Sequence, residues 1–143
     1  MKLALFLLWT VVIVGATTLP WSDYTGHSHW DHVRWMPFCE RPLVATDIVL
    51  NVILFVPFGF LLMWAGSTAR SARRATLTLI LAAALSISAE YFQVYCHNRI
   101  PSATDVCTNV LGAGLGILIR WWSEPGAKDG TELFGKPSSS QES

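Results

Sequence analysis

Charge is scarce in this chain, with 10 Lys and Arg and 10 Asp and Glu in 143 residues, of which 52% are hydrophobic. So apolar a composition excludes an ordinary soluble domain. The formal net charge is zero, so no basic surplus points to nucleic acid as a partner. Cysteine is also rare, and three thiols form at most one intramolecular disulfide. There are no internal repeats of convincing length.

The sequence contains four long apolar stretches. A helix needs roughly 20 largely apolar residues to cross a bilayer, and the stretches at about 3–19, 47–65, 75–95 and 105–122 qualify. Helices satisfy their backbone polar groups within a single segment, as a bilayer requires. The sequence therefore predicts an all-α membrane protein, a four-transmembrane-helix bundle over residues 1–122. Residues 123–143, rich in Ser, Gly, Pro and charge, are expected to form a disordered cytoplasmic tail.

The first stretch has an alternative interpretation. Met1-Lys2 followed by an apolar run and the small residues Gly15-Ala16 resembles a secretory signal peptide. The small-x-small cleavage pattern is poor at Ala16-Thr17-Thr18, however, and the run is nearly long enough to span, which favours a retained helix. Under either interpretation the loop that follows lies on the outer side of the membrane.

The basic residues predict an orientation, because cytoplasmic loops carry the excess of Lys and Arg. One side receives seven of the ten basic residues: Lys2, Arg70, Arg73, Arg74, Arg120, Lys128 and Lys136. Arg34, Arg41 and Arg99 then lie on the other side. We therefore expect a multi-pass protein of the bacterial cell membrane with both termini in the cytoplasm.

In that orientation six polar residues meet at or just below the outer surface: Asp47, Asn51, Glu90, Gln93, Asp105 and Asn109. Helical spacing places each group on one face of its helix, with Asp47 and Asn51 at i,i+4, Asp105 and Asn109 at i,i+4, and Gln93 continuing the face of Ser86 and Glu90. The face of the fourth stretch continues through Gly112 and Gly116, which allow close helix approach. We therefore expect this polar face to point into the bundle.

Carboxylates at this depth are expensive, so they are the first candidates for function. A structural interpretation is open, in which Asp105 caps a helix, the amides tie helices together and Glu90 pairs with Arg99. Three carboxylates converging with a nearby Arg are more typical of a binding or reaction site. We predict that Glu90, Arg99 and Asp105 form one coupled site, with charged atoms within direct or single-water contact.

These residues form an ordered set that closely resembles the VanZ-like membrane proteins. The set begins with Pro37-Phe38 and continues with Asp47-x-x-x-Asn51-x-x-x-Phe55-x-Pro57-x-Gly59, Glu90-x-x-Gln93, Arg99-x-Pro101-Ser102 and Asp105-x-x-x-Asn109-x-x-Gly112-x-x-x-Gly116. The resemblance covers roughly residues 37–120. It implies a membrane bundle of the cell envelope and, through the founding member of the family, a link to teicoplanin resistance, that is, to antibiotic resistance. Most relatives have no settled biochemical activity, so the resemblance specifies fold better than function.

Two classes of function follow. The first is a non-enzymatic envelope protein whose outward-facing pocket binds a lipid-linked cell-wall precursor or a lipoglycopeptide. Its ligand-binding residues would be Asp47, Asn51, Glu90, Gln93, Arg99, Asp105 and Asn109. The alternative is a membrane-embedded enzyme acting on a lipid-linked phosphate or sugar, with Glu90 or Asp105 as acid or base. That alternative also needs a nucleophile or metal, and the sequence offers no clear one, so we rank binding first and expect no cofactor.

Two further clusters contain residues that can bind metals or form disulfides. His27, His29, Asp31 and His32 are metal-ligand types, but their spacing is irregular and the loop's tryptophans suit the headgroup level of a membrane, so we predict no metal site. Cys39, Cys96 and Cys107 all fall on the predicted outer side, where disulfides persist. A bridge from Cys39 to Cys96 would tie the first loop over the polar residues, and the pairing is open.

Overall fold

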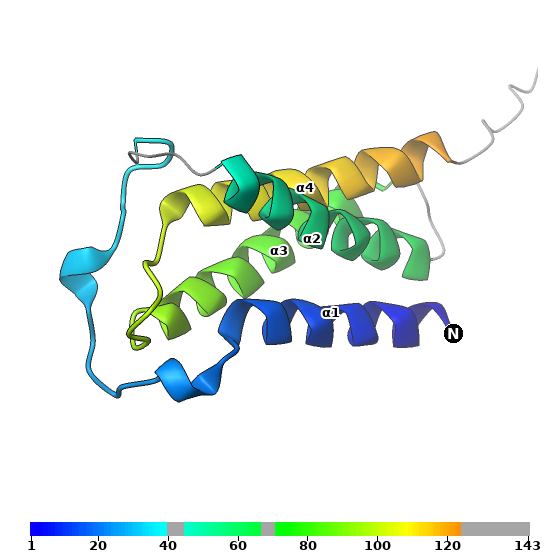
Figure 1. Cartoon of the computed structure of the whole chain (residues 1–143). Helices are drawn as coiled ribbons and strands as arrows, with labels where there is room; N and C mark the ends of the chain where they lie inside the picture. The colour runs from blue at the N-terminus through cyan, green and yellow to red at the C-terminus, as the bar shows by residue number, and fades with distance from the viewer. Residues whose placement is uncertain (40–44, 67–70, 124–143) are drawn as a thin grey trace, which may run out of the picture.

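The computed structural model describes residues 1–39, 45–66 and 71–123. Its four α-helices are α1 Lys2–Thr18, α2 Ala45–Ala65, α3 Ala72–Gln93 and α4 Ala103–Trp122 (Figure 1), with short 3₁₀ helices η1 Trp21–Asp23 and η2 Trp30–His32 in the first loop. Each apolar stretch of the sequence coincides with one α-helix, so the all-helical prediction is confirmed. The predicted tail beyond Ser123 and the basic residues Arg41, Arg70, Lys128 and Lys136 lie outside the described residues.

Two of the helices are long and apolar enough to cross a membrane. They are α2, with 21 residues, and α3, with 22 residues, while α1 is a shorter apolar helix of 17 residues. This is consistent with a membrane protein, as the composition predicts. Helix α4 has 20 residues and carries Asp105 in its first turn and Arg120 in its last.

Helices α2 and α4 pack backbone against backbone at three glycines. A Cβ added at Gly112 would overlap the backbone of Val52, and one added at Gly116 would overlap the backbone of Val56. Gly59 of α2 likewise faces the carbonyl of Ala113. The prediction that the glycine face of α4 points into the bundle is therefore confirmed, and the polar residues on the same face point inward with it.

The apolar core of the bundle adjoins this contact and includes residues of both helices, Phe55 of α2 and Ala113 of α4. Ile13, Phe55 and Ala113 are fully buried at its centre. Helix α1 is attached from the side by the Trp9 indole, whose Nε1 donates a 2.9 Å hydrogen bond to the carbonyl oxygen of Leu54. Helix α1 therefore contributes both apolar packing and a hydrogen bond to the bundle.

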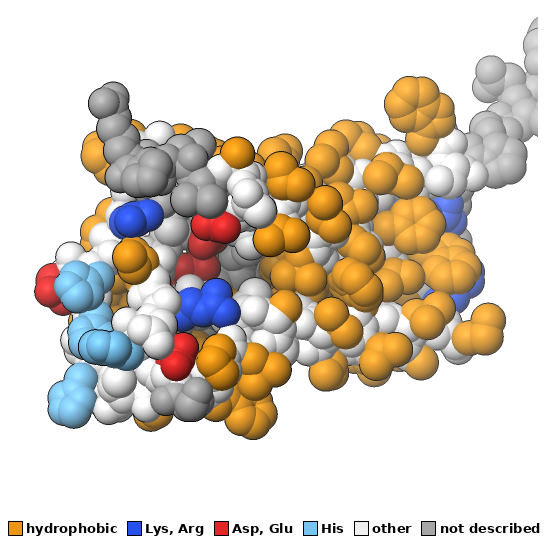
Figure 2. Space-filling view, in the orientation of Figure 1, with side chains coloured by type: hydrophobic (Ala, Val, Ile, Leu, Met, Phe, Trp, Pro, Cys, Tyr) orange, Lys and Arg blue, Asp and Glu red, His pale blue; other side chains and the backbone are white. Residues whose placement is uncertain are grey.

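The two ends of the bundle differ in charge. The chain begins at the end where α4 finishes, whereas the loop after α1 and the loop between α3 and α4 lie at the opposite end (Figure 1). Lys2, Arg73, Arg74 and Arg120 belong to the first end, and Figure 2 shows basic side chains there. The acidic side chains, the histidines and the remaining described arginines, Arg34 and Arg99, gather at the other end (Figure 2). We call these the basic end and the acidic end. The described basic residues thus divide between the two ends as the sequence predicts.

Candidate functional site

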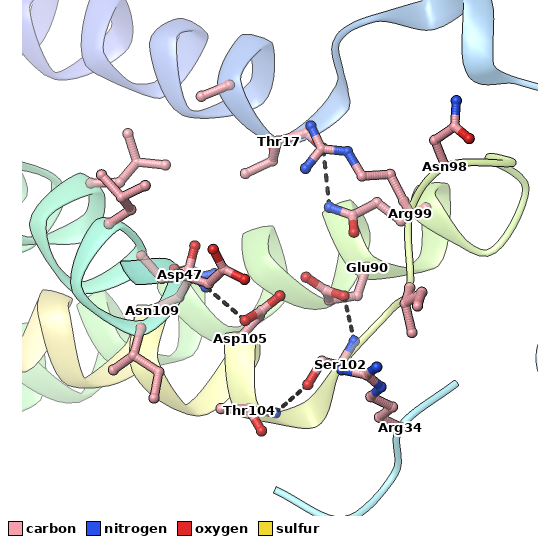
Figure 3. A pocket seen from close by; sticks show the side chains of 17 residues that line it. Thr17, Arg34, Asp47, Glu90, Asn98, Arg99, Ser102, Thr104, Asp105 and Asn109 are labelled. Atoms are coloured by element: carbon pink, nitrogen blue, oxygen red, sulfur yellow. Dashed lines mark hydrogen bonds between the residues drawn. The ribbon is translucent and has the colours of Figure 1, made fainter. Parts of the chain in front are cut away.

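A cavity of about 520 Å³ opens at the acidic end, between the helix ends and the two loops. Its lining includes all seven residues predicted to bind a ligand: Asp47, Asn51, Glu90, Gln93, Arg99, Asp105 and Asn109 (Figure 3). Volumes of this order are typical of sites for small ligands. Residues from four helices and two loops are therefore brought to one place.

Asp105, on α4, is hydrogen-bonded to a side chain of α2. The Asn51 Nδ2 on α2 donates a 2.8 Å hydrogen bond to Oδ1 of Asp105 on α4. Asp105 lies in the first turn of α4, where the helix dipole favours a negative charge. The turn itself is capped by Ser102, whose Oγ accepts a hydrogen bond from the Thr104 backbone N–H. An amide and a helix terminus thus support a carboxylate at this point.

Glu90 connects the last turn of α3 to the start of α4. Its Oε2 accepts a 2.8 Å hydrogen bond from the backbone N–H of Ser102, the N-cap residue of α4 (Figure 3). Hydrogen bonds from N–H groups stabilise the ionised form of a carboxyl group. Glu90 is part-buried and faces the cavity rather than the outer surface of the bundle.

Asn109 lies one turn further along α4 and is only 2% exposed. Its Nδ2 donates a 2.8 Å hydrogen bond to Oγ of Ser86, which is fully buried on α3. Its Oδ1 is buried and has no hydrogen-bond partner within the described part of the chain. A buried acceptor without a donor costs free energy, so this oxygen is a destabilising point in the polar contact between α3 and α4.

Gln93 and Arg99 both point to the end of α1. The Gln93 Nε2 donates to the carbonyl oxygen of Thr17 at 3.1 Å, and the Arg99 Nη2 donates to that of Leu19 at 3.0 Å. The last carbonyls of a helix lack partners within the helix, so they attract such donors. These two contacts fix the end of α1 as one side of the cavity.

The charged atoms of Glu90, Arg99 and Asp105 were predicted to lie within direct or single-water contact, and the structure shows no direct contact of Arg99 with either acid, while a contact through one water stays a prediction. Within the described residues Arg99 forms no ion pair with Glu90 or Asp105, although all three line the same cavity. The reason is the position of α1: the carbonyl of Leu19, the residue directly after this helix, accepts the hydrogen bond from the guanidinium. The three charged side chains therefore line one cavity, without a direct ion pair between Arg99 and either acid.

Arg34 also lines the cavity and was not predicted to be a site residue. Its backbone N–H donates to the Pro101 carbonyl, and its carbonyl accepts from the Ala103 N–H, both at 2.9 Å. This short parallel bridge holds the first loop against the start of α4. The pairing joins residues nearly 70 positions apart, so no local pattern in the sequence reveals it; the only signal was a basic residue on the predicted outer side.

The cysteines do not form the disulfide that the sequence left open. Cys39 and Cys107 are exposed and Cys96 is buried, and all three are free. Burial raises the pKa of the Cys96 thiol, nearby Asp23 raises it further, and Arg99 acts in the opposite direction. A raised thiol pKa lowers the thiolate fraction, which argues against Cys96 as a nucleophile.

The histidine cluster lies in the first loop, where His27 and His32 are exposed and the His29 Nε2 is buried. The His29 and His32 rings stack at 5.6 Å between centroids, and the His32 Nε2 lies 3.6 Å from a carboxylate oxygen of Asp31. Among the residues that the structure describes, no three His, Cys, Asp or Glu side chains are grouped so as to hold a metal ion. The cluster is separate from the cavity lining.

The comparison with protein families gives one match. The family model described as VanZ/LLP1 covers residues 2–123, which includes all four helices and the whole cavity lining. The resemblance drawn from the ordered polar motif is therefore confirmed. Neither the curated proteins nor the solved structures contain a significant match to this chain.

Proposed function

The chain belongs to the VanZ/LLP1 family, and on this premise we propose that it is a non-enzymatic envelope protein that binds an amphipathic ligand. The ligand would be a lipid-linked cell-wall precursor or a lipoglycopeptide. Binding of either would suit a protein that confers resistance to lipoglycopeptide antibiotics. The observation that carries the proposal is the collection of all seven predicted polar side chains in the lining of one cavity.

A four-span arrangement fits the surface of the helices. Large apolar side chains that are half exposed or more are spread over all four, for example Leu8 at 62%, Ile53 at 60%, Ile80 at 57% and Leu111 at 55%. Figure 2 shows hydrophobic side chains covering much of the visible helical surface between the two charged ends. Exposed apolar surface of this extent suits contact with lipid.

The basic end belongs in the cytoplasm under this proposal, because basic residues accumulate on that side of a membrane. The cavity then opens on the outer side, at the depth of the lipid headgroups. A ligand within the outer leaflet would reach it without crossing the bilayer.

The lining is mixed in a way that suits an amphipathic molecule. Helices α1 and α2 supply the apolar side chains Ala16, Ile48 and Leu54 together with the polar Asp47 and Asn51, and α3 and α4 supply Glu90 and Asp105. Pockets with an apolar side and a few placed polar groups orient their ligands in this way.

Binding suits the contacts of the two carboxylates better than catalysis does. Glu90 accepts from a backbone N–H, and Asp105 accepts from an amide. Both donors hold a carboxylate in place without giving or taking a proton. The alternative of an enzyme that acts on a lipid-linked phosphate or sugar needs a nucleophile or a metal in addition.

The test is native mass spectrometry of the full chain purified in mild detergent. We expect wild-type protein to retain an amphipathic molecule and the double variant Glu90→Gln/Asp105→Asn to lose it. Asp31→Asn, which removes an exposed carboxylate outside the cavity, serves as the control and should retain the molecule. A wild-type protein that carries no such molecule would contradict the proposal, and a retained metal ion would instead support the enzyme.

A further inference from the structure

Helices α1 and α2 run antiparallel, and we call the line of contact between them the α1–α2 seam. Three contacts close this seam from the basic end upward: the Lys2 Nζ lies 5.0 Å from the centroid of the Trp64 ring, the Phe6 and Phe58 rings are 5.2 Å apart, and Trp9 donates to the Leu54 carbonyl. Ile13, one turn beyond Trp9 on the same face of α1, is fully buried. The seam is therefore closed over most of the length of α1.

Toward the acidic end the seam opens into the cavity. The next positions after Leu54 on this face of α2 are Leu50 and Asp47, at helical spacing. Both are exposed, Leu50 at 59%, and both line the cavity. On α1, Ala16 is also exposed and also lines the cavity, and Figure 1 shows the two helices separating in this direction. These residues therefore form a rim where the cavity meets the outer surface of the bundle.

This rim faces the side of the bundle. Figure 2, seen across the helices, shows acidic side chains between hydrophobic ones near the acidic end. Exposed apolar side chains continue the surface on both helices, with Val11 67% exposed on α1 and Ile53 60% exposed on α2. We propose that a lipid enters the cavity sideways, through the open end of the α1–α2 seam, and that its hydrocarbon chain stays in the seam.

The inference rests on the proposed function, because the side of the bundle faces lipid only if the helices span a membrane. It adds the route of entry and the part of the ligand that the seam holds. An opening between two apolar helices meets the hydrocarbon of the outer leaflet, so a chain in the seam stays out of water throughout. A molecule without such a chain gains nothing from this route.

The side chains along the open seam suit a hydrocarbon chain. Apolar residues of both helices line the cavity there: Ala16, Ile48, Leu50 and Leu54. Two polar residues of α2 also line it, but they lie at its borders. Asp47 is in the first turn of α2, at the acidic end of the seam, and Asn51 is hydrogen-bonded to Asp105 on α4. An amphipathic ligand thus has an apolar place for its chain and polar groups beyond it for its head.

The α1 side of the opening is held in place by residues outside α1. The Gln93 Nε2 on α3 donates to the Thr17 carbonyl at 3.1 Å, and the Arg99 Nη2 donates to the Leu19 carbonyl at 3.0 Å. The last turn of α1 would have to break these bonds to close onto α2. The opening is therefore preformed, which spares a ligand the cost of ordering it.

The experiment measures retention of farnesyl phosphate, an isoprenoid chain with a phosphate head, by native mass spectrometry of the full chain in mild detergent. Wild type should retain it, and methyl phosphate, which has the head without the chain, should not be retained. Ala16→Trp and Leu50→Trp fill the rim from opposite sides and should each reduce retention about tenfold or more. Val11→Trp and Ile53→Trp place the same side chain at exposed positions of the same helices outside the cavity lining. These controls should stay within about twofold of wild type.

A second measurement does not depend on bulky side chains. In a chain without its native cysteines, Ala16→Cys and Leu50→Cys are joined across the rim by a bis-maleimide. Protein joined before farnesyl phosphate is added should not take it up. Protein joined afterwards should keep the probe through washing that removes it from unjoined protein. Failure of the two cysteines to be joined would mean that they do not face each other across one opening, and it would overturn the inference.

The outcomes distinguish this inference from the proposed function. Loss of farnesyl phosphate in Glu90→Gln/Asp105→Asn, with full retention in both rim variants, would overturn the side entrance and leave a binding cavity. Retention of methyl phosphate as strong as that of farnesyl phosphate would overturn the role of the chain. A wild-type protein that retains no farnesyl phosphate would also overturn the inference, whereas the proposed function is judged by the molecule that co-purifies with the protein.

Discussion

The middle of the bundle and its acidic end use the same two helices in opposite ways. At Gly112 and Gly116 the backbones of α2 and α4 touch, and there is no room for a Cβ between them. Two turns earlier along α4 the helices are joined instead through side chains, where Asn51 donates to Asp105. The first arrangement closes the bundle, and the second accompanies a cavity.

The comparison shows how one helix face carries two roles. Asp105, Asn109, Gly112 and Gly116 follow one another at intervals of three or four residues, so they lie along one side of α4. Small residues fix the distance between the helices in one part of that side, and polar residues fill the space in the other. The packing thereby holds the polar residues in place, and we expect changes in the two parts to have different consequences.

The orientation of the two ends gives an all-or-none prediction. Single cysteines placed at Ser28 and Ala72, both exposed, in a chain without its native cysteines should differ completely in labelling by an impermeant maleimide added to intact cells. Ser28→Cys at the acidic end should react, and Ala72→Cys at the basic end should react only after the cells are opened. The reverse pattern would place the cavity in the cytoplasm.

A side chain inserted into the close contact between α2 and α4 should have the largest effect on stability. Gly116→Val places a branched side chain against the backbones of Val56 and Phe60, which should cost about 3 kcal/mol or more and remove most folded protein from the membrane. Gly114→Ala is the control, because a Cβ there meets only a side-chain carbon of Leu79 at 3.9 Å. Equal abundance of the two variants would mean that the helix contact is not as close as described.

A smaller effect is expected where α1 joins the bundle. Trp9→Phe removes the hydrogen bond to the Leu54 carbonyl and should lower the free energy of unfolding in detergent by about 1 kcal/mol. Trp21→Phe makes the same change at a side chain that is 67% exposed and should change it by less than about 0.5 kcal/mol. The measurement also bears on whether α1 is retained, since a cleaved segment would leave the mature protein indifferent to Trp9.

The smallest effect concerns the buried thiol of Cys96. Burial and Asp23 raise the pKa of Cys96, so less thiolate is present near neutral pH and alkylation should be slowed severalfold relative to the unfolded chain. Its rate should reach half-maximum at a pH above the ordinary thiol value. Arg99→Gln should shift that midpoint further upward, because Arg99 lowers this pKa. Alkylation of Cys96 that follows the unfolded chain at every pH would contradict the burial.

Much of this fold can be predicted from the sequence because its determinants are local. Hydrophobic length locates the four helices, and the i,i+4 spacing of Asp105 and Asn109 together with two glycines indicates which side of α4 faces inward. The same reasoning gathers Asp47, Asn51, Glu90 and Gln93 at one end. Periodicity within a helix, plus alternation of helix direction, was sufficient for that.

The details of the site could not be predicted because they depend on contacts between distant segments. Arg34 reaches the cavity through a backbone bridge to Ser102, and Arg99 turns to the carbonyl of Leu19 in place of an acid. Neither choice is encoded in the neighbouring residues. The open acceptor of Asn109 likewise appears only when the surrounding donors are placed.

The central claim is that the charges of the cavity serve a ligand, whereas the close helix contact serves the fold. The most direct test compares Glu90→Gln and Asp105→Asn with wild type for both membrane abundance and the phenotype that the protein confers, such as tolerance to a lipoglycopeptide. Each change keeps the shape and much of the hydrogen bonding but removes a charge. We predict loss of the phenotype at nearly normal abundance. Full activity of both variants at wild-type abundance would contradict the account and leave these carboxylates a structural role.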